Sequence, residues 1–377
     1  MKIDIVTGPF AGIPPYSIGA VEKVWYSLGI EWLQQGHDIC FISKSTQKNV
    51  DSQQYIYVKG YARTGSWIKD FILDFIYSYK ALRKAPRADI IVLNTIWSPV
   101  LYVFFKKKFQ GALYNVARFP KKQMGLYKSM GCLACVSTPV YNALVKQSPC
   151  VSKLACVIPN PIDTRVFCVN ENLCLSKVEL TVIYAGRVHE EKGIDILVKA
   201  VTLLHDKGYN IRLKIIGAHS IDEGGSGTEY LNFLNSLTHD WSIEWIEPIY
   251  DPEMLARELN IGGIFCYPSV AEKGETFGVA PLEAMGLGLV PVVSDLDCFK
   301  DFIEHEVNGL SFNHRVPEAY ILLANCIEKL VNSRILYTRL SREAVKTSKL
   351  YSVSSIADKY LSVFKQMVGN ETIAVEK

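Results

Sequence analysis

The sequence predicts an α/β protein of two domains, each built around a parallel β-sheet covered by helices. Short apolar runs rich in β-branched residues alternate with helical patterns along the whole chain, and this alternation is typical of βαβ units. The chain has 377 residues and is 49% hydrophobic. Because single hydrophobic cores stop growing at about 250–300 residues, two cores are expected.

The first half predicts an N-terminal Rossmann-like domain over residues 1–165. Its opening run contains an acidic residue, which indicates a first β-strand rather than a secretory signal. The strands expected in this half are residues 3–7, 38–43, 89–93, 112–116 and 132–136.

The second half predicts a further Rossmann-like domain over residues 166–353. Its expected strands are residues 180–185, 212–216, 243–246, 263–267 and 290–293. The irregular, polar stretch 169–176 is expected to connect the two domains. The last helical pattern, residues 354–370, has an apolar face that needs a surface to pack on. The sequence leaves open which domain supplies that surface, and packing back onto the N-terminal domain is one arrangement.

Composition excludes several classes of protein. The formal net charge of +3 is too small for a nucleic-acid binder that neutralises many phosphates. The ten cysteines lie scattered along apolar segments, so they are expected to be reduced core residues rather than a disulfide scaffold. No apolar stretch approaches the roughly 20 residues of a membrane-spanning helix. A cytoplasmic location is therefore expected.

The most informative segment for function is residues 274–285, where Glu275 and Glu283 flank the start of a predicted helix. Gly278 loosens the entry, and Pro281 is tolerated because first-turn N–H groups have no partner within the helix. Such free N–H groups bind anions. Eight helical residues span roughly 12 Å, so the two carboxylates can contact opposite ends of an elongated ligand. A sugar, a diphosphate and a ribose in line fit this geometry.

An arginine and a lysine follow the predicted strand 180–185. Arg187 and Lys192 fall at its carboxyl end, the edge at which open α/β sheets bind ligands. A guanidinium offers phosphate oxygens a planar fork, and an ammonium offers a point charge. The two cations are therefore expected to neutralise a leaving diphosphate. The alternative is that Arg187 is a surface partner of Glu190 or Glu191.

These residues, with other motifs, resemble those of the retaining glycosyltransferases of family 4 (glycosyl transferases group 1). That family has the GT-B fold, an α/β architecture of two facing Rossmann-like domains with an interdomain cleft. The resemblance covers most of the chain in the expected order. The motifs that carry it are residues 18–22, 36–37, 159–163, 186–187, 192–193, 216–217, 267–269, 275–283, 291–294 and 308–310.

The resemblance implies an enzyme of the hexosyltransferase class. It would move a sugar from a UDP- or GDP-sugar to a glycan or lipid-linked saccharide, as in surface polysaccharide biosynthesis. Glu275, Arg187 and Lys192 would be catalytic, and catalysis would rest on positioning and charge stabilisation. No metal or other cofactor is expected. The residues implied to bind the donor are Gly19, Gly186, Thr276, Phe277, Gly278, Val279 and Glu283.

The N-terminal half departs from the family pattern in two places. Many relatives carry a histidine near the reacting sugar, and residues 115–120 contain none. Arg118 and Glu22 are the acceptor-side candidates, although an exposed loop arginine is an equal interpretation of Arg118. Ala20 replaces the second of two adjacent glycines, so close backbone approach to the donor phosphates is expected only at Gly19.

Other functions compete with this interpretation. Asp295 and Asp297 have the D-x-D form that metal-dependent glycosyltransferases use, but GT-B members use this loop without metal, so no metal site is predicted. A nicotinamide-dependent dehydrogenase would share the domain type, but residues 8–12 do not form G-x-G-x-x-G. The main alternative is a catalytically inactive protein of the same fold that binds a sugar nucleotide or a membrane surface.

A basic, aromatic region in the N-terminal half has two interpretations. It is either a solvated helix end, where cations meet the negative end of the helix dipole, or a contact with anionic lipid headgroups. The second interpretation would associate the protein with the cytoplasmic face of a membrane, near a lipid-linked acceptor. No nucleic-acid partner is expected. The lysines of this region are Lys106, Lys107, Lys108, Lys121 and Lys122.

Overall fold

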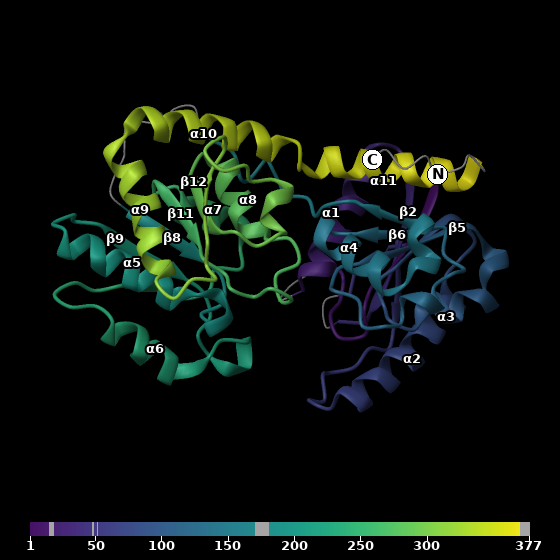
Figure 1. Cartoon of the computed structure of the whole chain (residues 1–377). Helices are drawn as coiled ribbons and strands as arrows, with labels where there is room; N and C mark the ends of the chain where they lie inside the picture. The colour runs from purple at the N-terminus through teal and green to yellow at the C-terminus, as the bar shows by residue number, and fades with distance from the viewer. Residues whose placement is uncertain (15–18, 47–48, 51, 170–180, 370–377) are drawn as a thin grey trace. The chain divides into compact units, whose positions relative to one another are not determined.

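The computed structural model describes residues 1–14, 19–46, 49–50, 52–169 and 181–369 (Figure 1). The chain divides into two compact units, unit 1 formed by Met1–Pro161 with Val353–Lys377, and unit 2 formed by Ile162–Ser352. Each unit contains one parallel sheet, so the predicted α/β fold class is confirmed. Most of the connector predicted at residues 169–176 lies outside the described residues.

Unit 1 has a seven-stranded sheet in the order β3-β2-β1-β4-β5-β6-β7. The five strands predicted in this half are present, and the two that were not predicted are the short edge strands, β3 and β7. The strands are β1 (Lys2–Val6), β2 (Asp38–Lys44), β3 (Tyr55–Val58), β4 (Ala88–Leu93), β5 (Phe109–Val116), β6 (Cys132–Cys135) and β7 (Ala155–Val157).

Helices cover both faces of this sheet, and Figure 1 shows α11 and α2 on opposite sides of it. The α-helices are α1 (Ala20–Gln34), α2 (Trp67–Lys84), α3 (Ser98–Leu101), α4 (Thr138–Gln147) and α11 (Val353–Gly369). The 3-10 turns are η1 (Tyr102–Phe104), η2 (Lys106–Lys108), η3 (Met124–Leu126) and η4 (Pro149–Leu154).

The last helix of the chain, α11, packs on unit 1. The indole Nε1 of Trp32 in α1 donates a hydrogen bond to the carbonyl of Ala357 (3.2 Å). The ring of Phe364 meets Trp32 edge to face, with 5.4 Å between ring centroids. Both rings belong to one buried cluster with strand residues such as Ile5 and Val92. A segment from the far end of the chain therefore completes the core of unit 1.

Unit 2 has a six-stranded sheet in the order β10-β9-β8-β11-β12-β13. The five strands predicted in this half are present, and β13 is an additional edge strand. The strands are β8 (Thr181–Ala185), β9 (Arg212–Ile216), β10 (Glu244–Ile246), β11 (Ile264–Tyr267), β12 (Val290–Ser294) and β13 (Leu310–Phe312). The helices are α5 (Ile194–Asp206), α6 (Gly227–Ser236), α7 (Pro252–Leu259), α8 (Val279–Gly286), α9 (Ala319–Asn332) and α10 (Arg334–Lys349), with 3-10 turns η5 (Glu190–Lys192), η6 (Ile221–Glu223) and η7 (Phe299–Asp301).

The strand order of unit 2 places a topological switch point between β8 and β11. From β8 the chain builds outward to β9 and β10, and it then returns to β11 on the other side of β8 and builds outward again. Connections therefore leave β8 and β11 in opposite directions, the arrangement that opens a crevice outside the carboxyl ends of the strands in other α/β sheets. Ligands bind in such crevices in open α/β sheets. A ligand-binding site of unit 2 is therefore expected in the loops after β8 and β11.

Candidate active site

The carboxyl ends of β8, β9 and β11 are packed tightly together. Gly186 and Gly217 have φ angles of +156° and +152°, a region that side chains rarely adopt. A Cβ atom on Gly217 would collide with the carbonyl oxygen of Gly186. The ring of Tyr184 stacks on that of Tyr267, with 5.5 Å between centroids and an interplanar angle of 13°. This packing gives the loops that follow a rigid base.

Lys192 and Glu275 form a buried ion pair on that base. The Nζ atom of Lys192 lies 2.8 Å from Oε2 of Glu275, and only 7% and 11% of the two side chains are exposed. The ammonium also lies 5.7 Å from the centroid of the Tyr267 ring. Removing one member of a buried pair leaves an uncompensated charge in a medium that solvates it poorly. The stability of this region therefore depends on both Lys192 and Glu275.

The two tyrosines near the pair remain neutral. Burial raises the pKa of Tyr267 well above its usual range, and the negative charge of Glu275 raises it further. Burial followed by the Glu275 charge also raises the pKa of Tyr184. The phenol of Tyr184 donates a hydrogen bond to the carbonyl of Arg187 (2.8 Å). The phenol of Tyr184 thus anchors the backbone, and neither phenol adds charge to the site.

Arg187 is held much more loosely than Lys192. Its side chain is 46% exposed, and Nη2 lies 2.8 Å from Oε1 of Glu191. Nη1 donates a hydrogen bond to the carbonyl of Gly224 (2.8 Å). The structure thus contains the Glu191 pairing that the sequence allowed. Exposed ion pairs contribute only about 0–1 kcal/mol, so the guanidinium can exchange Glu191 for another anion at small cost.

Helix α8 starts with an open N-terminus. Gly278 is the N-cap residue, with φ +86°, and no side chain of the described residues caps the first turn. A Cβ atom on Gly278 would collide with the ring of Phe299, so the residue must be glycine for steric reasons as well. The N–H groups of Val279 and Ala280 are at the positive end of the helix dipole. Such an end is suited to bind an anion.

The remaining residues of this segment have different surroundings. Phe277 is buried and packs against Phe302 and Tyr351, with ring centroids 5.3 Å and 6.0 Å away. Its side chain anchors the loop, which leaves only its backbone for a ligand. Thr276 is half-buried, and so is Glu283 in the second turn of α8.

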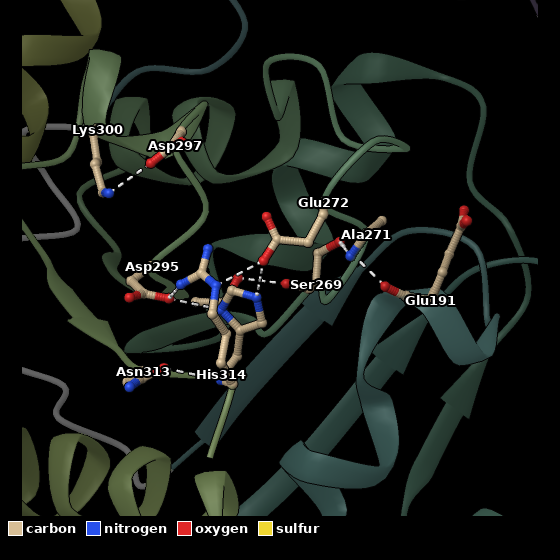
Figure 2. Close-up of polar contacts among 11 residues, drawn as sticks. Glu191, Ser269, Ala271, Glu272, Asp295, Asp297, Lys300, Asn313 and His314 are labelled. Atoms are coloured by element: carbon tan, nitrogen blue, oxygen red, sulfur yellow. Dashed lines mark hydrogen bonds and ion pairs between the residues drawn. The ribbon is translucent and has the colours of Figure 1, made fainter. Parts of the chain in front are cut away.

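Hydrogen bonds fix the start of the loop that carries Glu275 (Figure 2). The N–H of Val270 donates to the carbonyl of Glu191 (2.9 Å). The hydroxyl of Ser269 donates to the same carbonyl (3.3 Å). Ser294, at the end of β12, donates its hydroxyl to the carbonyl of Ser269 (2.5 Å). These contacts tie together the segments after β8, β11 and β12, which fixes the direction from which Glu275 approaches Lys192.

The two aspartates of the D-x-D sequence are both paired with cations. Oδ1 of Asp295 lies 2.6 Å from Nη1 of Arg315, and Oδ1 of Asp297 lies 2.6 Å from Nζ of Lys300 (Figure 2). Among the residues that the structure describes, no three metal-ligating side chains gather where they could hold an ion. The absence of a metal from the reaction remains a prediction.

Sequence reasoning missed a polar cluster beside this loop. Oε1 of Glu272 lies 2.8 Å from Nε of Arg315 and 3.1 Å from Nε2 of His314. The other ring nitrogen of the buried His314 lies 2.8 Å from Asp295, as Figure 2 shows. The cluster joins the loop after β11 to the loops after β12 and β13. Its members come from three segments far apart in sequence, so no local pattern indicated it.

The predicted N-terminal candidates belong to unit 1. Gly19 is the N-cap of α1, and a Cβ atom there would lie 2.8 Å from Oε2 of Glu22. Burial raises the pKa of Glu22, against hydrogen bonds from the backbone of Glu22 itself and of Gly8. Arg118 is exposed in the loop after β5. Glu22 is thus buried at the start of α1, and its acceptor role stays a prediction.

The lysines of the basic region are in two different environments. Lys108 donates hydrogen bonds to the carbonyls of Leu82, Arg83 and Ala85, at 3.1, 2.9 and 2.7 Å. It therefore caps the carboxyl end of α2, as the helix-end interpretation expects. The exposed lysines are Lys106, Lys107, Lys121 and Lys122.

Comparisons with known proteins agree with this geometry. The family described as glycosyl transferases group 1 matches residues 173–347, within unit 2. The phosphatidyl-myo-inositol mannosyltransferase of Mycobacterium tuberculosis (strain ATCC 25618 / H37Rv) is 24% identical over 318 residues, 81% of this chain and 76% of that protein. An uncharacterized glycosyltransferase of Haemophilus influenzae is 26% identical over 362 residues, 92% of this chain and 96% of the relative. The match to the Mycobacterium leprae mannosyltransferase, 25% identical, spans only 46% of that protein and 49% of this chain.

Solved structures extend the similarity over nearly the whole chain. Sucrose-phosphate synthase from Thermosynechococcus elongatus aligns with a TM-score of 0.76 and 18% identity, over 98% of this chain and 100% of the other. Anabaena Alr3699/HepE in complex with UDP and glucose aligns with a TM-score of 0.71 and 17% identity, over 97% and 99%. Identities this low indicate the fold alone, and that fold is GT-B. The resemblance inferred from the sequence is confirmed: residues 173–347 match the group 1 glycosyltransferase family, the similar curated proteins are glycosyltransferases, and the chain has the GT-B fold.

Proposed function

We propose that this protein is a retaining glycosyltransferase that uses a UDP- or GDP-sugar. Its acceptor would be a glycan or a lipid-linked saccharide, in surface polysaccharide biosynthesis. The observation that carries the proposal is the buried Lys192–Glu275 pair just before the open N-terminus of α8. Both features lie at the carboxyl ends of the strands that flank the switch point, where α/β sheets bind ligands.

The charges of this site are complementary to a nucleoside diphosphate. Lys192 and Arg187 supply two cations, and the first turn of α8 supplies N–H groups. Arg187 would exchange its loosely held partner, Glu191, for phosphate oxygens. When the bond between sugar and phosphate breaks, negative charge develops on the leaving diphosphate, and these fixed groups would stabilise it.

The two glutamates would hold the neutral parts of the donor. Glu275 accepts hydrogen bonds from sugar hydroxyls while Lys192 keeps its carboxylate in place, and Glu283 accepts them from the ribose. In a retaining reaction without a protein nucleophile, the departing phosphate oxygen takes the proton of the acceptor hydroxyl. The protein then contributes position and charge rather than a covalent intermediate. We also propose that the reaction needs no metal, because the nearby aspartates already have cationic partners.

The names of relatives support this choice of substrates. A Staphylococcus aureus relative, 27% identical over 153 residues, is a capsular polysaccharide biosynthesis glycosyltransferase, and the mycobacterial relatives act on phosphatidyl-myo-inositol by name. The structure of Alr3699/HepE holds UDP. These names favour a nucleoside diphosphate donor and a glycan or lipid acceptor for this chain.

We further propose association with the cytoplasmic face of a membrane. The exposed lysines Lys106, Lys107, Lys121 and Lys122 would contact anionic headgroups, each contributing about 1 kcal/mol near such a surface. Lys108 would stabilise α2 instead, because its ammonium is already bound to carbonyl oxygens. In the described part of the chain, no helix is long and apolar enough to cross a bilayer.

A thermal-shift measurement tests the donor site. We expect UDP or GDP, and the matching sugar nucleotides, to raise the unfolding temperature with or without a chelator. A ligand at about a hundred times its Kd stabilises by about 2.7 kcal/mol, which is readily measured. An NMR spectrum of the product would then show the donor's anomeric configuration if the enzyme is retaining. No shift with any nucleoside diphosphate, or a shift that requires a divalent metal, would contradict the proposal.

A further inference from the structure

Helix α2 presents an apolar face to solvent. Trp67, Ile68 and Ile72 are 75%, 54% and 53% exposed, and the same side of the helix carries further large apolar side chains. At 3.6 residues per turn, all of them fall within an arc of roughly 140°. The residues of this apolar face are Trp67, Ile68, Phe71, Ile72, Phe75 and Tyr79.

The buried side of α2 combines Tyr77, Ala81 and Leu82 with two polar residues, which hold the helix in place. Asp74 and Ser78 are buried. Oδ1 of Asp74 accepts hydrogen bonds from the backbone of Trp97 (3.1 Å) and from the Ser78 hydroxyl (3.3 Å), and that hydroxyl lies 2.7 Å from Oγ1 of Thr95. These bonds would have to break for α2 to rotate. The apolar face is therefore held outward.

Aromatic packing gives this face a fixed shape. The ring of Trp97 lies 4.9 Å from that of Phe71 and 5.2 Å from that of Phe75, and its Nε1 donates a hydrogen bond to the Phe71 carbonyl (3.1 Å). At the other end, Tyr79 meets Phe105 edge to face at 5.8 Å. The apolar surface thus continues from α2 toward η1, where Phe104 is also exposed.

Cations border the apolar face, and the acidic residues of α2 are turned away from it. Asp74 is buried, and Asp70 accepts hydrogen bonds from the backbone and hydroxyl of Thr64. The exposed cations of α2 are Lys69, Lys80, Arg83 and Lys84. On the adjoining turn η2, Lys106 and Lys107 are exposed as well.

Exposed apolar residues in unit 2 have a different distribution. Ile335 and Leu350 are 86% and 63% exposed, but they are single residues at the two ends of α10. Scattered apolar residues are normal on protein surfaces, whereas a contiguous patch with a polar rim marks an interaction site. The patch on α2 is of the second kind.

We propose that the apolar face of α2 inserts into the interface of an anionic lipid bilayer. Interfacial helices combine Trp, Phe and aliphatic residues on one face with Lys and Arg beside it, and aromatic rings favour the depth of the headgroups. A second copy of this chain is a poorer partner for the apolar face, because a two-fold symmetric contact would place the cations of both copies close together. This insertion rests on the membrane contact proposed above. The vesicle-binding test contains neither donor nor acceptor, so its result does not depend on whether the protein transfers a sugar.

Co-sedimentation with vesicles tests the insertion. We expect the full chain to bind vesicles of phosphatidylcholine and phosphatidylglycerol, and to bind pure phosphatidylcholine more weakly. The triple variant Trp67→Ser, Ile68→Ser, Ile72→Ser should bind at least about tenfold more weakly, because three side chains lose the apolar surface that insertion removes from water. The matched control, Ile335→Ser with Leu350→Ser, removes equally exposed side chains and should bind like the parent protein.

Charge reversal tests the nature of the surface. The double variant Lys69→Glu, Lys80→Glu should bind anionic vesicles more weakly, by about fivefold or more per residue. Added salt should also weaken the binding of the parent protein to these vesicles. All variants should keep the far-UV circular dichroism of the parent protein. The proposal is overturned if the parent protein ignores anionic vesicles, or if the triple variant or the charge reversal leaves binding unchanged. It is also overturned if sedimentation velocity without lipid shows a dimer that the triple variant dissociates.

Discussion

Unit 2 buries a lysine and a glutamate together, whereas unit 1 buries an aspartate by itself. Lys192 and Glu275 lie 2.8 Å apart at the ends of two strands. Asp4 lies in the middle of β1, fully buried, and neither carboxylate oxygen has a hydrogen-bond partner among the described residues. Burial raises the pKa of Asp4 to about 7.

The two regions show two outcomes of burying an ionisable group. A carboxyl group without a partner stays neutral up to about neutral pH, because desolvation penalises its charged form. A group with a partner can keep its charge, at a cost that well-packed apolar residues would avoid. Sequences retain the more costly arrangement where charge has a use, and here it lies at the candidate active site.

The largest effect is expected for Lys192→Ala. It leaves the Glu275 carboxylate buried without its ammonium, so we expect loss of transfer and destabilisation by about 3–5 kcal/mol. Initial rates with the donor identified by thermal shift measure the first effect, and urea unfolding measures the second.

The double variant Lys192→Met, Glu275→Leu separates folding from function. Replacing both charges by apolar side chains of similar size should recover most of the stability without recovering activity. A double variant that transfers sugar at the parent rate would show that the pair is only structural. A single variant of unchanged stability would show that the charges are not buried in solution.

The next effect is a pH dependence of stability that comes from Asp4. Its pKa is about 7 in the folded chain, against an ordinary value of 3.8. Between these values the folded protein keeps a proton that the unfolded chain releases, so the contribution is full below pH 4 and is lost as pH rises to about 7. The loss is on the order of 4 kcal/mol. Urea unfolding of Asp4→Asn should lack this slope and be more stable at pH 8.

The exposed neighbour Asp38 provides the control for that measurement. It lies on the adjacent strand β2, and its carboxylate is 69% exposed, 3.7 Å from the ammonium of Lys2. In Asp38→Asn, the free energy of unfolding should still fall clearly between pH 4 and 7. An equal fall in Asp4→Asn would mean that other groups cause it.

A smaller effect on stability is expected for Arg187→Ala, because this ion pair is exposed. We expect a loss of less than about 1 kcal/mol, but roughly 10–100-fold weaker donor binding, because hydrogen bonds to charged groups contribute about 1.5–3 kcal/mol. Calorimetric titration with the nucleoside diphosphate measures the affinity. Arg257→Ala, which removes a more exposed pair with Glu253 on α7, should change neither quantity. Equal donor affinity in Arg187→Ala and Arg257→Ala would remove Arg187 from the site.

The sequence predicted the central strands of both sheets and the edge strand β10, but not the edge strands β3, β7 and β13. Central strands such as β11 are continuous apolar runs, because helices cover both faces of a parallel sheet. β7 and β13 have three residues each, too few to show a period. A β-strand of this length is defined by the neighbour that it pairs with, which a local pattern does not contain.

The sequence predicted the residues of the site but not their pairing. It assigned Lys192 and Arg187 the same role, whereas the structure gives one a buried partner 83 residues away and the other an exposed partner four residues away. Burial of a long-range pair depends on how the loops after β8 and β11 meet, which no spacing records. In the same way, the pattern of α2 shows an apolar face, and only the contacts of its buried residues show which of its apolar side chains are exposed.

The smallest expected effect has the opposite sign and comes from Glu191→Gln. In the chain without ligand, the Glu191 carboxylate holds the guanidinium of Arg187 at 2.8 Å, so a diphosphate must displace it. An exposed pair of this kind contributes about 0.2–1 kcal/mol, and its removal should tighten donor binding by up to about fivefold. The gain should disappear when Arg187→Ala is already present, which a double-mutant cycle measured by calorimetry would detect. If Glu191→Gln instead weakened donor binding, the Glu191 carboxylate would orient Arg187 for the phosphate rather than compete with the phosphate. Arg187 would then be preorganised for the donor, as the buried Lys192 is.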